Sequence, residues 1–100
     1  MVVLINSFEV DPKNDERFLA AWRRASDVME RRPGFLRTRL HRALAAGPRF
    51  VNIAEWESHE AFAAAIASSE FRAAAPAILS VASMTPALYE LAYESQPRSV

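Results

Sequence analysis

The chain has 100 residues, of which 51% are hydrophobic and 24% charged, a composition typical of one folded domain rather than a disordered chain. Twelve basic residues balance twelve acidic ones, so we expect neither a nucleic-acid partner nor an anionic membrane surface. Cysteine is absent, which excludes disulfides and thiolate chemistry. Because the sequence has no long apolar run and no signal-peptide pattern, we expect a cytoplasmic protein.

The N-terminal part of the chain predicts a strand followed by a helix. Residues 2–10 alternate with high β-propensity and place Asn6 and Phe8 on the same face. Residues 15–31 have helical periodicity and end at a proline-glycine pair. The apolar residues of this helix recur at steps of four, three and four and form one stripe: Phe18, Trp22, Ala25 and Met29.

The middle of the chain predicts an antiparallel hairpin, with strands over residues 35–44 and 50–56 joined by an Ala-Ala-Gly-Pro turn. Strict alternation in the first strand sets Phe35, Arg37, Arg39 and His41 against Leu36, Thr38 and Leu40. The second strand places Asn52 and Trp56 on one face. Because asparagine is rare in strands and costly to bury without partners, this face is a candidate functional surface.

The C-terminal part predicts two short helices and a final strand. The helices cover residues 60–68 and 70–75, the second ending near Pro76, and the strand covers residues 87–93. The first of these helices places Phe62 and Ile66 one turn apart. We expect a single domain over residues 1–95, followed by a polar tail over residues 96–100.

The order β-α-β-β-α-β predicts a ferredoxin-like α+β fold, in which an antiparallel four-stranded sheet carries its helices on one side. Alternation leaves an apolar group on the other side of that sheet: Val3, Ile5, Val51 and Ile53. Since an apolar sheet face of this size is unfavourable in water, we expect a second copy to cover it and the protein to be a homodimer.

Four segments together resemble the antibiotic biosynthesis monooxygenase domain. They are LINSFEV in the first strand, PGFL after the first helix, NIAEWESHEAF across a strand and a helix, and SEFR in a later helix. The resemblance extends over about residues 2–95 and implies the dimeric α+β barrel of that family. PGF followed by WES is fairly specific for the family and much less specific for any one activity.

Within the family, the chain is similar to the small cofactor-independent monooxygenases that oxidise anthrone-like aromatic polyketides to quinones. This resemblance implies a small aromatic substrate, O₂, no cofactor, and catalytic roles for Asn6, Asn52 and Trp56. The side-chain NH₂ of asparagine and the indole N–H are neutral donors, which suit a developing oxyanion. The implied substrate-binding residues are Phe8, Phe18, Trp22, Phe62, Ile66 and Arg72, with Phe62 in the place of a pocket tyrosine.

Two other functions stay open at this point. Haem-degrading members of the family share the asparagine at Asn6, but Ala65 or its neighbour stands where they have a tryptophan, and Ala75 stands where they have the iron-ligating histidine. Neither His41 nor His59 occupies the ligand position, and we expect no metal site. The remaining alternative is a non-catalytic dimer that binds a small ligand, in which the strand asparagines and the tryptophan serve structure or binding alone.

Overall fold

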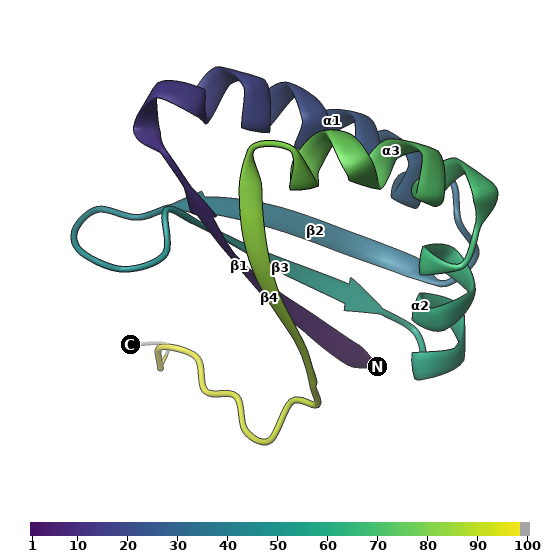
Figure 1. The fold of residues 1–100 in the computed structure, drawn as a ribbon. Helices are drawn as coiled ribbons and strands as arrows, with labels where there is room; N and C mark the ends of the chain where they lie inside the picture. Colours follow the sequence, from purple (N-terminus) through teal and green to yellow (C-terminus); the bar gives the residue numbers. More distant parts are fainter. Residues whose placement is uncertain (99–100) are drawn as a thin grey trace.

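Residues 1–98, which the computed structural model describes, form a four-stranded antiparallel sheet with helices packed against one of its faces (Figure 1). The strand order is β2-β3-β1-β4. In chain order the elements are β1 (Val2–Val10), a 3₁₀ turn η1 (Pro12–Asn14), α1 (Asp15–Glu30), β2 (Phe35–Arg42), β3 (Phe50–Trp56), α2 (His59–Ile66), α3 (Ser69–Leu79) and β4 (Ala82–Tyr89). The predicted ferredoxin-like α+β fold is confirmed, with the second helical region divided into α2 and α3.

The central strands β1 and β3 determine which side chains face the helices. They pair antiparallel with Asn6 opposite Asn52 and Val2 opposite Trp56. Successive side chains alternate between the two faces of a sheet. The predicted grouping of Asn6, Asn52 and Trp56 on one face is therefore confirmed, and that face is the one the helices cover.

Strand β2 contains an irregularity that strict alternation did not predict. Phe35 is opposite Trp56, but Arg37 is opposite Glu55, so Leu36 is an extra residue in the pairing. After a β-bulge of this kind, the side chains of the bulged strand point to the opposite faces of the sheet from those that regular alternation predicts. The prediction that Phe35 and Arg37 share a face was wrong: Phe35 packs under the helices, whereas Arg37 pairs with Glu55 on the open face.

Helix α3 is longer than predicted, because it continues through Pro76 to Leu79 instead of ending at residue 75. A proline inside a helix removes one hydrogen bond and is normally unfavourable. The extra turn is stabilised by packing, since Ala74 and Ile78 lie one turn apart and are both buried in the core. Burial on this face outweighs the local cost of the proline.

Strand β4 runs from Ala82 to Tyr89, earlier in the chain than the predicted strand over residues 87–93. The prediction was wrong because Pro86 makes this stretch look unlike a strand. The strand order leaves β4 at the edge of the sheet, where a residue without an N–H is tolerated. The shift brings Met84 and Pro86 to the level of Phe8 and Asn6 in β1.

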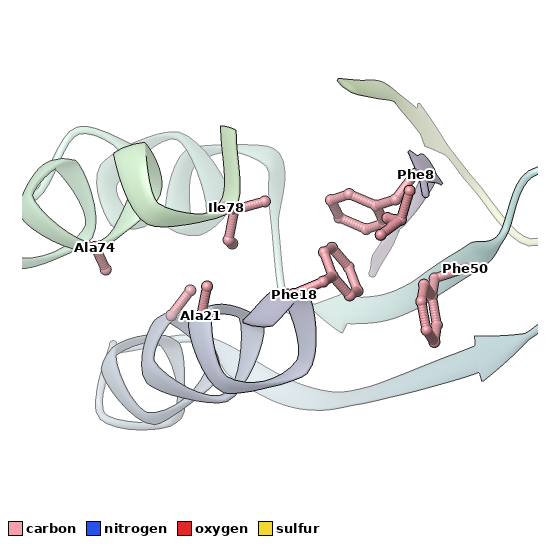
Figure 2. Packing of buried hydrophobic residues seen from close by; sticks show 8 residues of the cluster. Phe8, Phe18, Ala21, Phe50, Ala74 and Ile78 are labelled. Atoms are coloured by element: carbon pink, nitrogen blue, oxygen red, sulfur yellow. The ribbon is translucent and has the colours of Figure 1, made fainter. Parts of the chain in front are cut away.

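The core consists of two groups of buried side chains. In the first, the Phe18 ring lies between those of Phe8 and Phe50, with centroid distances of 5.0 Å and 4.7 Å (Figure 2). α1 and α3 pack together above this group through Ala21, Ala74 and Ile78. The second group forms around Trp56, Ala54 and Ala65, near α2.

The other face of the sheet carries the predicted apolar residues Val3, Ile5, Val51 and Ile53, which are partly exposed. Residues 90–98 follow β4 without helix or strand, on the side of the sheet away from the helices (Figure 1). Of the tail predicted over residues 96–100, the last two residues lie outside the described part of the chain. Within residues 1–98, no single helix is long and apolar enough to cross a membrane, although α2 and α3, bent by 73° at their junction, reach that length and composition together.

Candidate functional site

A cavity of about 220 Å³ lies between the sheet and the helices, where the two groups of the core adjoin. Aromatic rings supply much of its wall: Phe8, Trp22, Phe35, Trp56, Phe62 and Phe71. Its polar side chains are few, and the sheet provides Asn6, Thr38, Asn52 and Trp56. An apolar enclosure with a few convergent polar groups is the usual form of a small-molecule site.

Asn6, Asn52 and Trp56 form a polar edge on the sheet side of the cavity. Asn6 and Asn52 are each 8% exposed and lie directly opposite one another, and Trp56 is 1% exposed four residues after Asn52 on β3. Two buried amides and an indole N–H are costly in an apolar interior unless each finds a partner. The partners of these groups therefore indicate whether the arrangement serves the fold or a ligand.

Asn52 has a defined partner. The hydroxyl of Thr38 on β2 donates a hydrogen bond of 2.5 Å to Asn52 Oδ1. Thr38 itself lines the cavity, so the pair lies at the cavity wall. With its oxygen engaged in this way, the side chain of Asn52 offers its NH₂ group as the remaining polar function.

Asn6 has a weaker partner. Its Nδ2 donates to the sulfur of Met84 on β4 at 3.5 Å, and its Oδ1 is buried without a hydrogen-bond partner among residues 1–98. A thioether is a weak acceptor, and the two ends of an asparagine amide exchange places by a half-turn of the side chain. Asn6 can therefore offer either a donor or an acceptor to a molecule in the cavity.

Trp56 has no polar partner in the described part of the chain. Its Nε1–H is buried and finds no acceptor among residues 1–98. A buried donor left unpaired costs about 1–3 kcal/mol. The ring is held in place by edge-to-face contacts with Phe35 at 5.3 Å and Phe62 at 5.9 Å, so the N–H is fixed in direction by packing alone.

The loop between α1 and β2 supports the tryptophan. Gly34 has a φ of +85°, a conformation that favours glycine, and its carbonyl accepts a 2.8 Å hydrogen bond from the backbone N–H of Glu57. This bond joins the loop to the end of β3, immediately after Trp56. The PGF and WES segments are thus in direct contact, and together they fix Phe35 against the indole ring.

The structure brings most of the predicted site residues together. The cavity wall includes the three predicted catalytic residues and four of the predicted substrate-binding residues: Phe8, Trp22, Phe62 and Ile66. It does not include the other two. Phe18 is completely buried in the core, and Arg72 is exposed on α3. Neither contacts the space that a bound molecule would occupy in a single chain.

Several wall residues were not predicted from the sequence. Thr38 and Phe35 reach the same cavity because of the bulge at Leu36, which simple alternation does not reveal. Met84 was missed because the predicted last strand began too late. Leu79 lies in the part of α3 beyond the predicted end of the helix, whereas Phe71 lies within the predicted helix and was not assigned to the site.

The donor set of the cavity is neutral. No residue of its wall, as described over residues 1–98, is acidic, basic or a histidine. Ala75 lines the cavity, and its methyl group cannot ligate iron, while His41 and His59 lie outside the wall. In the same part of the chain, no group of three or more His, Cys, Asp or Glu side chains is placed to hold a metal ion. These residues do not fit a haem or a metal centre.

Comparisons with known proteins agree with this geometry. The model of the antibiotic biosynthesis monooxygenase family matches residues 1–77. SnoaB, a cofactor-independent oxygenase from Streptomyces nogalater, is similar with a TM-score of 0.86 at 30% sequence identity, over 97% of both chains. A proposed monooxygenase from Shewanella loihica PV-4 has a TM-score of 0.76 at 29% identity, over 93% of this chain and 95% of that one. A search of curated proteins gives no match.

The family match covers strands β1 to β3, helices α1 and α2 and most of α3, and includes Asn6, Thr38, Asn52 and Trp56. The likeness to SnoaB extends through β4 to nearly the full length of both chains. On sequence and fold together, this chain belongs to the antibiotic biosynthesis monooxygenase family.

Proposed function

We propose that the protein is a cofactor-independent monooxygenase that uses O₂ to oxidise a polycyclic phenol or an anthrone-like aromatic compound to a quinone. The observation that carries this proposal is the buried, unpaired Nε1–H of Trp56, beside Asn52 and Asn6 in an otherwise apolar cavity. A donor that the fold leaves unpaired gains a hydrogen bond if a bound ligand places an acceptor beside it. A phenolic or ketonic oxygen on a flat aromatic ring would satisfy it while the rings of the wall cover the ring faces.

The substrate itself would supply the electrons. Loss of a proton from the CH₂ group of an anthrone gives an enolate, which carries its charge on the ketone oxygen. The enolate transfers one electron to O₂, and the two radicals combine at the former CH₂ carbon as a peroxide. Protonation, loss of the second hydrogen as a proton and cleavage of the O–O bond give a second ketone and water. One oxygen atom enters the ring and the other leaves in water, so the equation balances without a cofactor.

The residues of the chain would contribute position and charge stabilisation. The NH₂ of Asn52 and the N–H of Trp56 would donate to substrate oxygens on which negative charge develops. The wall as described contains no base, so the proton would leave to water and the rate would follow the acidity of the substrate. Neutral donors favour the enolate because they stabilise the charged form without competing for the proton.

The relatives support the same class of reaction. SnoaB is a cofactor-independent oxygenase, and at 30% identity its activity is a reasonable starting point for this chain. The neutral wall described here fits a reaction that needs no metal. No feature of this wall favours haem degradation, since Ala75 replaces the ligand that haem chemistry would need.

We also propose that the working form is a homodimer. Val3, Ile5, Val51 and Ile53 give the open sheet face an apolar centre, next to the Arg37–Glu55 ion pair. Packing two such faces together would bury the apolar centres and yield an α+β barrel. The two cavities would then lie on opposite sides of the paired sheets.

The direct experiment measures O₂ consumption by the purified, chelator-treated protein supplied with an anthrone. We expect one quinone formed for each O₂ consumed, at a rate well above the spontaneous oxidation, and no loss of rate on chelation. Binding of the anthrone with no O₂ uptake above background would instead indicate a small-ligand-binding protein. A requirement for added haem or metal would contradict the proposal directly.

A further inference from the structure

We infer that Thr38 is a positioning residue, which holds the amide of Asn52 by its oxygen so that the NH₂ group faces the substrate oxygen. This inference rests on the proposed function and adds to it a residue that acts through Asn52. It comes from the hydrogen bond between Thr38 and Asn52. Among residues 1–98, this is the one hydrogen bond between two cavity-wall side chains in which both the donor and the acceptor are nitrogen or oxygen.

The geometry of the pair is that of a diagonal contact between neighbouring strands. Thr38 is opposite Ala54 in the β2–β3 pairing, and Asn52 is opposite Leu40, so the two side chains reach across one step of the sheet. The Thr38 hydroxyl donates to Asn52 Oδ1 at 2.5 Å. Asn52 is 8% exposed, so a broken contact would leave its amide oxygen buried without a partner.

The bulge at Leu36 makes this contact compatible with the rest of the site. Phe35 must face the helices to pack against Trp56, and Thr38 must face them to reach Asn52. These residues are three apart, and regular alternation would send them to opposite faces. The extra residue resolves this conflict, since Leu36 is left 45% exposed while Phe35 and Thr38 both line the cavity.

The two asparagines of the site differ in this respect. Among residues 1–98, Asn6 has only the sulfur of Met84, at 3.5 Å, as a hydrogen-bond partner for its side-chain amide, whereas Asn52 has the hydroxyl of Thr38. An oxyanion requires a donor, and a donor that is already oriented stabilises it without reorganisation. Asn52 is therefore the preorganised donor of the pair, and Asn6 is the adaptable one.

The first experiment compares Thr38→Val and Thr38→Ser with the parent protein. Valine keeps the branched shape and removes the hydroxyl, while serine keeps the hydroxyl. We expect Thr38→Val to lower kcat for an anthrone by roughly tenfold to a hundredfold with little change in KM. Thr38→Ser should restore most of the loss. Ser69→Ala, which removes an exposed hydroxyl at the start of α3 outside the cavity wall, should retain the parent rate.

The decisive step is to repeat Thr38→Val in an Asn52→Ala background. A residue that acts through Asn52 has almost no further effect once that side chain is gone. An equal loss in both backgrounds would overturn the inference, because Thr38 would then contact the substrate or support the fold independently. A failure of Thr38→Ser to recover the rate would also overturn it.

The outcomes separate this inference from the proposed function. A slow Asn52→Ala variant together with an unimpaired Thr38→Val variant would contradict the role of Thr38 alone. An unimpaired Asn52→Ala variant would contradict the proposed chemistry and this inference with it. A readout that needs no turnover is the NMR signal pair of the Asn52 side-chain NH₂. We expect Thr38→Val to shift that pair and to leave the Asn6 pair in place, and an unmoved Asn52 pair would contradict the hydrogen bond.

Discussion

At the residue scale, the site depends on polar groups that are uncharged and incompletely paired. Asn6 and Trp56 each bury an atom without a hydrogen-bond partner among residues 1–98, in a domain of only 100 residues. Such atoms lower the stability of a small domain by an amount that matters to its folding. Their retention at the wall of one cavity is explained when a ligand supplies the missing partners.

Asn6 tests whether an unpaired polar atom lowers stability while it contributes to activity. Asn6→Leu replaces the amide with an apolar side chain of similar size and removes the unpaired Oδ1. We expect turnover of an anthrone to fall, by less than for Asn52→Ala, while the melting temperature stays equal or rises. The check is a thermal melt and a rate measured on the same preparation. A clear loss of stability with an unchanged rate would show that Asn6 serves the fold.

Much of this residue-scale arrangement could be predicted from the sequence. Strand alternation, with the first and third strands taken as neighbours, placed Asn6, Asn52 and Trp56 on one face, and this holds because β1 and β3 are regular and pair directly. Thr38 could not be assigned to the same wall, because it lies on the same face of the sheet as Phe35 only when the bulge at Leu36 is present. Arg72 was expected at the cavity from family resemblance, and the structure places it on the exposed side of α3. The residue pattern also cannot predict which buried polar atoms lack hydrogen-bond partners, because this depends on the packing of the side chains.

At the element scale, two local contacts hold the cavity walls in position. The loop before β2 is joined to the end of β3 by the Gly34–Glu57 hydrogen bond, and the start of β3 is joined to α1 by the Arg49–Asp15 ion pair. The first contact supports Trp56, and the second ties the hairpin to the helix that carries Trp22. The fold class followed from the element order, whereas α3 and β4 were misjudged because both contain a proline.

Gly34 and Gly47 give a matched pair of substitutions. Both have positive φ, but a Cβ at Gly34 would lie 2.5 Å from Ala61 Cβ, whereas a Cβ at Gly47 meets nothing within 4 Å. We expect Gly34→Ala to lower the free energy of unfolding by more than the roughly 1–2 kcal/mol that an unfavourable backbone conformation costs. Gly47→Ala lies in an exposed hairpin loop and should cost less. Equal losses in denaturant titrations would show that the approach of α2 to this loop is not tight.

The ion pair at the start of α1 predicts a specific pH dependence. Hydrogen bonding to Arg49, helped by its positive charge and opposed by burial, holds the pKa of Asp15 below its usual value of 3.8. The folded state therefore gains stability from ionised Asp15 above that pH and loses it as the pH falls through the lowered pKa. Asp15→Asn should lower the melting temperature at neutral pH, and the difference from the parent should shrink in acid.

The control for this measurement is Asp27→Asn. Asp27 is exposed on the same helix and forms no ion pair within residues 1–98. Its substitution removes an exposed carboxylate from the same helix and should leave the melting temperature at neutral pH close to that of the parent. A difference between Asp15→Asn and the parent that does not shrink in acid would mean that the ion pair with Arg49 does not form in solution.

At the scale of the whole molecule, the sheet separates two surfaces with different roles. The helix side encloses the cavity, and the other side presents Val3, Ile5, Val51 and Ile53 around the middle of β1 and β3. A single chain of 11.2 kDa has a small hydrophobic core, so exposing these apolar residues to water costs a substantial part of its stability. Pairing two sheets would recover that cost and brace the strands that carry the polar edge of the site.

Ile53→Asp tests this pairing. We expect the parent protein to have about twice the 11.2 kDa chain mass by light scattering, and the variant to dissociate or unfold because it would bury an unpaired charge. Ala64→Asp, at an exposed position of α2, adds the same charge outside the sheet and should stay dimeric. A monomeric parent protein at micromolar concentration would contradict the barrel.

The measurement that tests the central claim most directly is the turnover of an anthrone by Trp56→Phe. Phenylalanine keeps an aromatic ring between Phe35 and Phe62 and removes the unpaired N–H. Loss of one donor to a developing oxyanion typically lowers kcat by about 10²–10³. Trp22→Phe removes an N–H from the helical wall of the same cavity and should raise KM more than it lowers kcat. We expect Trp56→Phe to show the large loss of kcat while the protein stays folded and dimeric. A kcat within about a factor of two of the parent value would contradict the claim that this N–H stabilises the reacting oxygen.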